Sequence, residues 1–500
     1  MDYSHLQNGS DVRGIAQPGP DGRPVDLTQP AVTAIAAGFA AWLAKRTGKN
    51  ELRVAVGRDS RLSGPQLEAW TCAGLAQGGA AVTSFGLAST PAMFMSTVTA
   101  GWAYDGAVMI TASHLPFHRN GLKFFTPAGG VEKEDIAAIL ALAADITPTE
   151  APAEPERRDF MPVYAAQLAQ KIRAGVQAKD HEHPLAGLHV VVDAGNGAGG
   201  FFVEGVLKPL GANTDGSRYL EPDGRFPNHI PNPENAEAMQ SIQDAVLASK
   251  ADLGIIFDTD VDRAGAVLAD GEELNRNRLI ALMSAILLRD HPGTTIVTDS
   301  VTSTGLAAFI AAHGGVHCRY KRGYRNVIGK AQALNAEGVD AQLAMETSGH
   351  GALKENYFMD DGAYLMVKLL IELGRGQDLE EMLSTLAQPA ESAEVRMNLA
   401  AADRAAYGQK VLDTVRAALE KAPGCTLAPD NFEGVRFEFD KDHGDGWMLL
   451  RMSLHDPLMP LNIESNRAGG AAEIARQTLP ELAGFTELDT SALAALAHKE

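Results

Sequence analysis

Short runs rich in apolar and β-branched residues recur along the first three quarters of the chain, and each soon reaches an aspartate. Residues 52–56, 189–192 and 295–297 are such runs, and each is followed by a loop containing Gly, Ser or Thr and then by a helix-like segment. Strand, loop and helix repeated at similar intervals are typical of a chain of α/β units. The pattern therefore predicts three similar α/β domains.

Breaks in this pattern mark the expected domain boundaries. Residues 147–159 carry three prolines among Ala and Glu, so this stretch cannot hold a helix and is predicted to be an exposed linker. A strand at residues 264–269 gives way to a helical pattern near residues 271–275, and a third break lies at residues 388–389. The α/β domains are therefore expected at residues 1–155, 156–273 and 274–388.

The chain after the third break has a different pattern. A helical stretch at residues 404–421 is followed by alternating strands at residues 435–439 and 447–452, and then by a helix at residues 470–479 that Pro480 is expected to end. This mixture is typical of an α+β domain. The expected fold class is therefore α/β, with a smaller C-terminal α+β domain at residues 389–500.

Composition and charge narrow the classes of function. With 45% hydrophobic and 21% charged residues among 500, the chain is globular rather than disordered or fibrous. Lys and Arg total 43 against 63 Asp and Glu, and no basic run offsets the net charge of −20, so we expect neither nucleic acid nor a membrane surface as a partner. Three distant cysteines fit no disulfide framework, and no apolar stretch is long enough to cross a bilayer, which predicts a cytoplasmic protein.

The first candidate for chemistry is a serine in residues 111–116, which read Thr-Ala-Ser-His-Leu-Pro and directly follow an apolar strand. Open α/β sheets place ligands at the carboxyl ends of their strands, although an isolated serine there more often caps a helix or a turn. His114 lies beside Ser113, and Asn120–Gly121 predicts a hairpin turn that returns Lys123 toward it. A cation near a serine suits an oxyanion or a phosphate.

The second candidate is a run of acidic residues after a buried strand, with Asp258, Asp260 and Asp262 at alternate positions and Arg263 next to them. Three such carboxylates repel one another unless a hard cation lies between them, and oxygen ligands suit Mg²⁺ or Ca²⁺. An added arginine suits phosphate chemistry. The alternatives are a solvated acidic turn and a simple ion pair of Arg263 with one aspartate.

A third loop carries Glu346, Ser348 and His350 after another short apolar run. Acceptors and donors on one glycine-containing loop are what a polyhydroxylated ligand requires, although a lone Glu or His on a loop is usually a surface residue. Asp360 and Asp361, a little further on, are expected to be helix caps rather than catalytic groups.

A fourth loop carries Arg451, Ser453 and His455 at the end of a strand in the last domain. Such side chains, together with exposed backbone N–H groups, can grip a phosphate monoester. The alternative is a plain strand end with an Asp-Pro turn.

Taken in this order, the four loops resemble the α-D-phosphohexomutase superfamily, and most closely its phosphomannomutase/phosphoglucomutase branch. The resemblance runs the full length of the chain, and it implies three topologically similar α/β domains and a fourth α+β domain around a central cleft to which each contributes one loop. Further matches are Arg13 in residues 11–14, Gly-Arg-Asp-Ser-Arg at residues 57–61, and Asp-Gly-x-Phe-Pro-Asn-His-x-Pro-Asn-Pro-Glu within residues 222–234.

The resemblance implies an intramolecular phosphotransferase that interconverts hexose 1-phosphate and hexose 6-phosphate through a phosphoserine and a hexose 1,6-bisphosphate, which also acts as activator. Lys123 is preferred over His350 as the general acid/base. The implied roles are phosphoserine for Ser113, Mg²⁺ ligands for Ser113, Asp258, Asp260 and Asp262, sugar contacts for Glu346 and Ser348, and a phosphate grip for Arg451, Ser453 and His455.

The remaining implied catalytic groups are Arg13, His114 and Arg263. An anionic intermediate that turns around without leaving requires a locally positive cleft despite the overall negative charge. The residues expected to provide that cleft are Arg13, Arg58, Arg61, Lys123, Arg263, Lys321, Arg322, Arg325 and Arg451.

Several positions depart from the family pattern. Leu115 stands where the serine loop usually has Asn, Leu454 and His455 replace the customary Asn and Thr, and Tyr324 stands where some members have His. Thr347 differs from the Gln typical of glucosamine-specific members, which favours mannose or glucose phosphates over glucosamine phosphate as substrate. No residue separates mannose from glucose, and the chain is expected to be a monomer or small homo-oligomer.

Two other functions are weighed against the mutase. A haloacid-dehalogenase-type phosphatase would use Asp258 as its nucleophile, because an apolar strand running into Asp-x-Asp is also that family's motif. It would leave Ser113 without a role, and Asp262 replaces the usual Thr or Val. A non-catalytic sugar-phosphate sensor would have lost its serine or its acidic triad, and both are intact.

Overall fold

The structure is a computed structural model that describes residues 1–20, 22–151, 153–453 and 456–499. The chain divides into two compact units, one formed by Met1–Asn275 and Ser348–Glu380 and the other by Arg276–Thr347 and Glu381–Glu500. Within the described residues, no helix combines the length and the apolar character that crossing a membrane requires.

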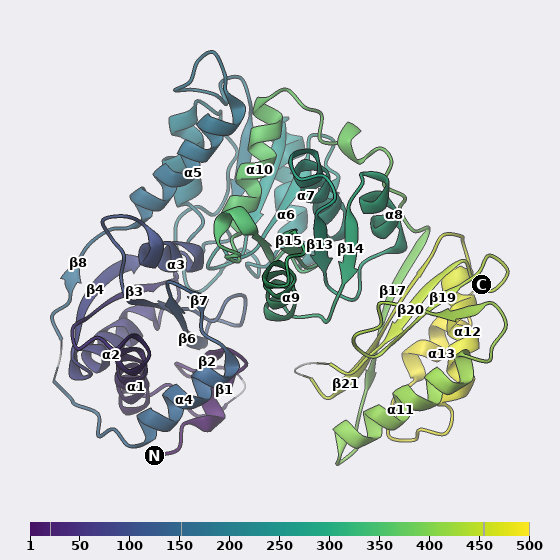
Figure 1. Ribbon diagram of the computed structural model, residues 1–500, viewed down its shortest axis with the longest axis horizontal. Helices are drawn as coiled ribbons and strands as arrows, with labels where there is room; N and C mark the ends of the chain where they lie inside the picture. Colours follow the sequence, from purple (N-terminus) through teal and green to yellow (C-terminus); the bar gives the residue numbers. More distant parts are fainter. Residues whose placement is uncertain (21, 152, 454–455, 500) are drawn as a thin grey trace. The chain divides into compact units, whose positions relative to one another are not determined.

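In the first sheet of the first unit, β3 lies between β4 and β5 and is parallel to both (Figure 1). Strand β6 pairs antiparallel with β5, and β2 pairs antiparallel with β6. Because parallel strands end at the same edge of a sheet, the loops after β3 and β5 leave side by side. The strands in sheet order are β1 (Gln7–Asn8), β2 (Asp11–Ile15), β6 (Arg119–Thr126), β5 (Gly106–Ile110), β3 (Leu52–Arg58), β4 (Ala80–Leu87) and β8 (Glu156–Arg157), with β7 (Gly129–Gly130) beside β6.

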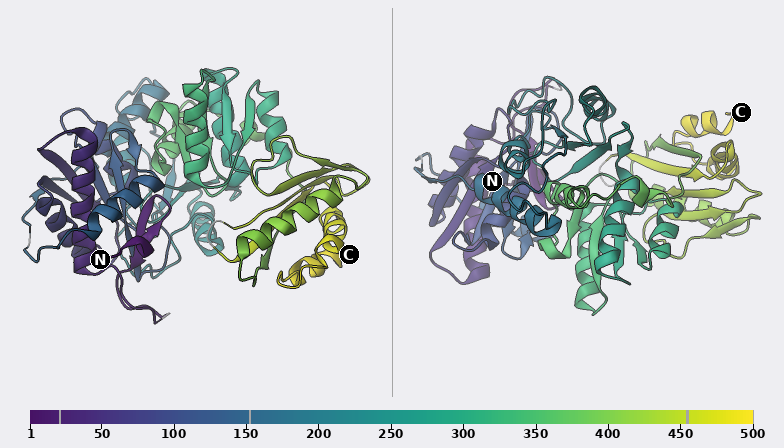
Figure 2. Two further views of the ribbon diagram at one scale, coloured as in Figure 1. Left: turned by 60° about the horizontal axis from the view of Figure 1, so that its bottom comes forward. Right: turned by 90° about the horizontal axis from the view of Figure 1, so that it is seen from above.

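Helix α1 (Gln29–Thr47) is the central helix of this domain, and most of its residues between Ala31 and Leu43 are buried. A helix that is apolar on nearly all sides must be covered on nearly all sides, and α1 packs against both α2 and α4 (Figure 2). The other helices are η1 (Ser4–Leu6), α2 (Gly64–Gln77), α3 (Thr90–Val98) and α4 (Lys133–Ala144).

The hairpin turn expected at Asn120 and Gly121 is wrong. Both residues lie inside β6, and the connection from β5 is made by residues 111–118. A Cβ atom on Gly121 would lie 2.9 Å from the carbonyl oxygen of Thr111, so glycine here permits the close approach of neighbouring backbone rather than a turn. The return of Lys123 on a strand antiparallel to β5 is confirmed.

The second sheet of the first unit has the order β12-β11-β10-β9, with β10 parallel to β9 and antiparallel to β11. The late segment Ser348–Glu380 joins this unit because its helix α10 packs against α5. The elements are α5 (Met161–Val176), β9 (Val190–Asp193), η2 (Val203–Leu207), η3 (Lys208–Leu210), α6 (Ala236–Ser249), β10 (Leu253–Phe257), β11 (Ala264–Leu268), β12 (Glu273–Leu274), β16 (Gly351–Leu353), η4 (Lys354–Asn356) and α10 (Gly362–Gly374).

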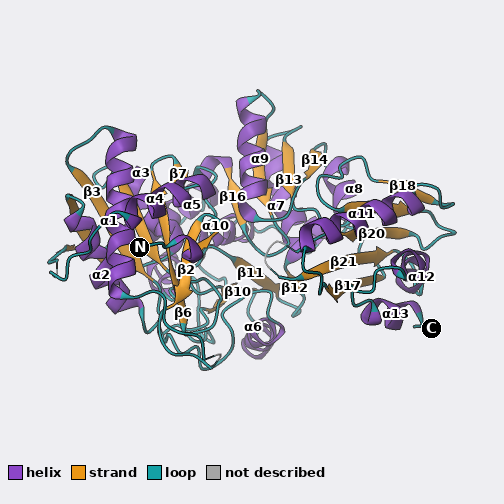
Figure 3. Cartoon of the chain, turned by 90° about the horizontal axis from the view of Figure 1, so that it is seen from below, coloured by secondary structure: helices purple, strands orange, loops and turns teal. Residues whose placement is uncertain are grey.

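The second unit contains a parallel sheet, in which β13 lies between β14 and β15 (Figure 1). It also contains an antiparallel sheet in the order β17-β21-β20-β19-β18, of which Figure 3 labels β17, β21, β20 and β18. The change from parallel α/β units to a β-rich C-terminal domain agrees with the sequence pattern. The elements are α7 (Arg276–Asp290), β13 (Thr295–Thr298), α8 (Thr304–Ala312), β14 (Val316–Arg319), α9 (Tyr324–Ala336), β15 (Ala341–Met345), η5 (Glu381–Leu383), β17 (Glu391–Asn398), α11 (Arg404–Leu419), β18 (Cys425–Leu427), β19 (Val435–Phe439), β20 (Gly446–Leu450), β21 (Leu458–Ser465), α12 (Gly470–Leu482) and α13 (Ser491–Ala497).

Helix α12 does not end at Pro480 as expected but continues to Leu482. A proline removes one backbone donor, and in the last turn only a single helical hydrogen bond is lost. The buried side chains of Ile474, Ala475 and Leu482 hold the helix against the sheet across this position.

Candidate active site

Ser113 lies in the loop after β5, in a conformation that serine rarely adopts. Its φ is +51°, in the left-handed region, which costs roughly 1–3 kcal/mol for a residue other than glycine. The element that follows is strand β6, so Ser113 caps no helix, although it does lie in a turn. A strained residue that the surrounding structure holds in place is a feature of functional sites.

The hydroxyl of Ser113 contacts charged groups on two sides. Its Oγ donates to Oδ2 of Asp258 at 3.2 Å and accepts from the guanidinium of Arg263 at 3.1 Å. The Nδ1 atom of His114 lies 3.3 Å away. The serine loop and the acidic loop, distant in sequence, therefore meet at this oxygen.

The acidic loop begins where β10 ends, and its three carboxylates are buried with ligand atoms within 4.8 Å of one another. Burial and the charge of Asp262 raise the pKa of Asp258 well above its usual value and that of Asp260 to about 6. Burial also acts on Asp262, but the charges of Lys123, His350 and Arg263 outweigh it and lower the pKa of that carboxyl. The solvated acidic turn considered above is wrong because these groups are almost fully buried.

The donor set of this loop fits a hard divalent cation. Among the described residues, Oδ1 of Asp260 and Oδ1 of Asp262 are buried and have no hydrogen-bond partner. Buried carboxylate oxygens without partners are costly unless a cation neutralises them, and Mg²⁺ takes oxygen ligands. Val261, between the two aspartates, has a φ of +67°, which is strained for a β-branched residue and fixes the tight turn of the loop.

Arg263 forms hydrogen bonds with the groups that surround the hydroxyl of Ser113. Its guanidinium lies 3.1 Å from Oδ2 of Asp258, 2.7 Å from Nδ1 of His114 and 3.1 Å from Oδ1 of Asn232. Burial, with Arg263 and Arg13 nearby, lowers the pKa of His114 to about 3. His114 is therefore a neutral imidazole at neutral pH, and its Nδ1 accepts the hydrogen bond from Arg263.

The strands β2 and β6 add two cations to the cluster. Nζ of Lys123 lies 3.0 Å from Oδ2 of Asp262 and 3.9 Å from Oδ2 of Asp11. Arg13 also pairs with Asp11, at 2.9 Å. The structure thus brings the predicted Lys123 into direct contact with the acidic loop, and it reveals Asp11 as a partner that the sequence alone did not indicate.

Asp360 is a site residue that sequence reasoning missed. It was expected to cap a helix, but only its neighbour Asp361 does so, by accepting from the backbone N–H of Tyr364 at 2.9 Å. Asp360 instead accepts from Nδ1 of His350 and from the backbone N–H of Gly351. The sequence did carry a signal for a second role, because two adjacent acids precede this helix and only the one at the N-cap position can cap it.

His350 is consequently a charged histidine. Burial opposes its charge, yet Asp360 and Asp262 raise its pKa to about 9. Ligand atoms of Asp262, His350 and Asp360 lie within 4.8 Å of one another, which places this pair next to the acidic loop.

Two arginines expected to line a cleft are bound to protein groups. Arg58 pairs with Glu68 at 3.0 Å, and Arg61 pairs with Asp59 at 3.2 Å. The side chain of Arg61 has 0% exposure, so it cannot contact a ligand, and its inclusion among the cleft cations is wrong.

The second unit holds the other predicted residues. Glu346 follows β15, and its Oε1 accepts from the backbone N–H of Gly323 at 2.5 Å. Arg451 follows β20 and donates to the carbonyl of Met452 at 3.3 Å, while Oγ of Ser453 accepts from the N–H of Asp456 at 3.2 Å. His455 and Leu454 lie outside the described residues. Ser348, although only two positions from Glu346, belongs to the first unit and is buried there.

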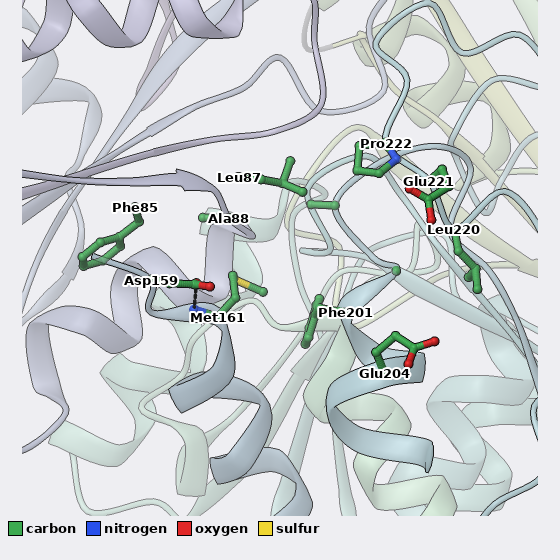
Figure 4. Close-up of a pocket in the computed structure, with 12 residues that line it drawn as sticks. Phe85, Leu87, Ala88, Asp159, Met161, Phe201, Glu204, Leu220, Glu221 and Pro222 are labelled. Atoms are coloured by element: carbon green, nitrogen blue, oxygen red, sulfur yellow. Dashed lines mark hydrogen bonds between the residues drawn. The ribbon is translucent and has the colours of Figure 1, made fainter. Parts of the chain in front are cut away.

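Two of the cavities in the first unit differ in how they relate to the predicted site. One, of about 550 Å³, adjoins the serine loop and is lined by His114, Leu115, Pro116 and Phe117 together with residues from Arg225 to Asn235. The other, of about 430 Å³, contains none of the predicted site residues. Figure 4 shows it with Asp159 and Met161 between Phe85 and Phe201, and with Glu204 and Glu221 at its edge.

Comparisons with known proteins place the chain in a family. Family models described as "Phosphoglucomutase/phosphomannomutase, alpha/beta/alpha domain" I, II and III match residues 4–150, 162–271 and 275–390. A phosphoglucomutase of Neisseria gonorrhoeae is 30% identical over 430 residues, which cover 85% of this chain and 87% of that protein. A phosphomannomutase/phosphoglucomutase of Pseudomonas syringae pv. tomato is 32% identical over 437 residues, covering 85% and 86%.

A solved structure extends the similarity to almost the whole fold. The phosphoglucomutase/phosphomannomutase family protein from Burkholderia thailandensis is 26% identical, with a TM-score of 0.79, and the match covers 97% of this chain and 98% of that one. Three α/β domains followed by a β-rich domain define an α-D-phosphohexomutase, and the expected fold class is confirmed. Within that superfamily, the chain belongs to the phosphoglucomutase/phosphomannomutase family.

Proposed function

We propose that the protein interconverts the 1-phosphates and 6-phosphates of mannose and glucose, with Ser113 as the phosphate carrier. The observation that carries the proposal is the environment of the serine hydroxyl, whose Oγ lies 3.2 Å from a carboxylate oxygen of Asp258 and 3.1 Å from the guanidinium of Arg263. A phosphoryl group on this oxygen would sit between a cation site and a fixed arginine. Phosphoryl transfer depends mainly on such positioning and charge stabilisation.

In the forward direction, the bond between Oγ of phospho-Ser113 and phosphorus breaks while a bond forms between that phosphorus and the free hydroxyl oxygen of the hexose phosphate. The hydroxyl proton passes to a protein base, and the product is a hexose 1,6-bisphosphate. After the intermediate turns around, its other phosphoryl group returns to Ser113, and the sugar oxygen regains a proton. The bisphosphate supplied in trace amounts phosphorylates the resting enzyme in the same way.

We assign separate catalytic roles to the residues of the first unit. We assign proton exchange to Lys123, which reaches the acidic loop from β6 at 3.0 Å from Asp262. Arg13, Arg263 and the charged His350 stabilise the negative charge of the transferring group, and neutral His114 orients Arg263. Mg²⁺ held by Asp258, Asp260, Asp262 and phospho-Ser113 would supply further electrostatic stabilisation there.

The residues of the second unit, with Ser348, recognise the rest of the substrate. We assign the sugar hydroxyls to Glu346 and Ser348, and the phosphate that does not react to Arg451, Ser453 and His455. Support comes from Arg451, a buried guanidinium whose Nε has no partner among the described residues and which an anion would satisfy.

The test is a mutase assay with mannose 1-phosphate, glucose 1-phosphate and glucosamine 1-phosphate, in Mg²⁺ with a trace of the bisphosphate. We expect turnover of the first two, no detectable turnover by Ser113→Ala, and unchanged turnover by Ser249→Ala, whose hydroxyl bonds only to its own helix. Turnover that is indifferent to Ser113 would contradict the proposal. A protein-bound phosphate labile to hydroxylamine would instead support an aspartyl phosphate on Asp258.

A further inference from the structure

The peptide groups of Ser113 are held on both sides. Its backbone N–H donates to Oγ1 of Thr111 at 2.9 Å, and its carbonyl oxygen accepts from the guanidinium of Arg61. Both partners are buried, so neither hydrogen bond competes with water. The backbone of the serine is therefore fixed independently of the contacts that its hydroxyl makes.

Both partners are themselves oriented by one carboxylate, that of Asp59. Oγ1 of Thr111 donates to its Oδ2 at 2.7 Å, and Nε of Arg61 donates to the same oxygen at 3.2 Å. The second oxygen accepts from the backbone N–H of Arg61 at 2.9 Å. Asp59 follows β3, which lies beside β5, so a residue at the end of β3 supports the serine loop that follows β5.

Arg61 also collects the other carbonyl groups of the serine loop. Its guanidinium donates to the carbonyl oxygens of Leu115 at 2.6 Å, Pro116 at 2.9 Å and Arg119 at 3.0 Å. The carbonyls of Leu115 and Pro116 lie in the connection between β5 and β6, and the carbonyl of Arg119 lies at the start of β6. Arg61 therefore ties the serine loop to the strand that follows it. A planar guanidinium offers five N–H donors in a fixed geometry, whereas a lysine offers three.

We infer that Asp59, Arg61 and Thr111 are positioning residues that hold Ser113 in its left-handed conformation and so aim its Oγ at Asp258 and Arg263. The inference rests on the proposed function, because it assumes that Ser113 carries the phosphate. A backbone with φ of +51° is unfavourable for serine and persists where hydrogen bonds on both sides determine it. The loop is thereby set before substrate binds.

Thr111→Val and Thr111→Ser test the inference as a pair, because valine keeps the shape of threonine while serine keeps its hydroxyl. We expect the valine variant to lose about 10- to 100-fold in kcat with KM changed less than twofold, because a small misplacement of a nucleophile is costly. The serine variant should stay within about threefold of the wild type. Thr83→Val is the matched control, since Thr83 is a buried threonine of the same sheet whose hydroxyl bonds to Glu156.

The outcomes separate this inference from the proposed function. Equal kcat for the two Thr111 variants, with Ser113→Ala inactive, would overturn the positioning role alone. An active Ser113→Ala would overturn the phosphoserine mechanism instead. Arg61→Lys, which keeps a cation beside Asp59 but serves fewer carbonyls, should show the same kcat loss.

Amide hydrogen exchange on the wild-type chain tests the same inference without substitution. The N–H of Ser113 should exchange as slowly as the amides of β5, because it is buried and bonded to Thr111. Exchange as fast as in the linker at residues 147–151 would show that the loop is not held, and would overturn the inference even if the variants failed to fold.

Discussion

Two buried arginines, Arg263 in the first unit and Arg451 in the second, differ in the direction in which their surroundings shift the pKa. Arg263 is 2% exposed and bonds to Asp258, and although burial opposes its charge, Asp258 and Asp262 raise its pKa. Arg451 is 6% exposed, and burial together with the charge of Arg322 lowers its pKa. Its Nε has no partner among the described residues.

The difference separates two kinds of binding site. Around Ser113 the protein supplies both signs of charge, so the arginine is compensated and held in place before any ligand arrives. Around Arg451 nearby acidic groups offset the charge only in part, because burial and Arg322 still lower the pKa of the guanidinium, and such a charge is stabilised when an anion binds. The first arrangement suits a reaction centre, and the second suits the recognition of a phosphate.

Arg263→Met should have the largest effect, because it removes the compensation from the reaction centre. Asp258 would be left buried without its partner, which typically costs about 3–5 kcal/mol of unfolding free energy. Loss of a fixed donor to the transferring group should lower kcat by about 10²- to 10³-fold. Steady-state kinetics and urea unfolding measure the two effects, and an unchanged unfolding midpoint would contradict the account of Arg263 as a compensated charge.

Arg451→Met should act differently, on KM and not on stability. A hydrogen bond to a charged group contributes about 1.5–3 kcal/mol, so we expect KM for the hexose phosphate to rise about 10- to 100-fold. The unfolding midpoint should not fall, because the buried charge that is removed is only partly compensated by its acidic neighbours. Arg476→Met is the control, since Arg476 bonds to the carbonyl of Ala497 in the same domain. A clear loss of stability in the Arg451 variant alone would remove the contrast with Arg263.

Much of the fold was predictable because its signals are local. Apolar runs in the sequence predicted β3, β9 and β13, and the change of pattern after residues 388–389 predicted the β-rich domain. The errors arose where tertiary contacts override local preference. Asn120–Gly121 has the composition of a turn but lies in a strand pressed against its neighbours, and Pro480 is tolerated in the last turn of a packed helix.

The candidate site was predictable where one loop carries the whole motif, as with the alternate aspartates 258, 260 and 262. It was not predictable where a residue acts on a distant part of the chain. Asp59 binds Thr111 across 52 positions, and Asp11 meets Lys123 from another strand. Asp360 was missed because the two aspartates before α10 are alike in sequence, and only the packed structure separates the cap from the partner of His350.

Alanine substitution of Asp360 and Asp361 tests whether the first acts as the partner of His350 and the second as a helix cap. Asp360→Ala removes the carboxylate that keeps His350 charged, so we expect about a tenfold fall in kcat, as for other residues that orient a site group. Asp361→Ala removes a helix cap, which typically costs about 1 kcal/mol of unfolding free energy, and should leave kcat within about twofold. Kinetics and urea unfolding of both variants decide the matter, and equal kcat values would return Asp360 to a structural role.

The last prediction concerns His317 in the second unit, whose pKa shifts in the opposite direction to that of His350 in the first. Burial, with Arg319 and Arg436 nearby, lowers the pKa of His317 to about 3, and its Nε2 lies 2.8 Å from Oγ1 of Thr298.

The sign of the pH dependence follows from where the proton binds. In the unfolded chain the pKa of His317 returns to about 6.5. Below that pH the unfolded state binds a proton at His317, whereas the folded state binds it only near pH 3. The stabilisation is therefore complete above pH 6.5 and is lost as the pH falls toward 3, by at most about 1.4 kcal/mol per pH unit. Urea unfolding of the wild type and His317→Gln at pH 7.5, 6 and 5 should show the stability difference shrinking in that order. Parallel pH profiles would mean that His317 binds a proton as readily in the folded state as in the unfolded chain, and the contrast between the two regions would then rest on Arg451 alone.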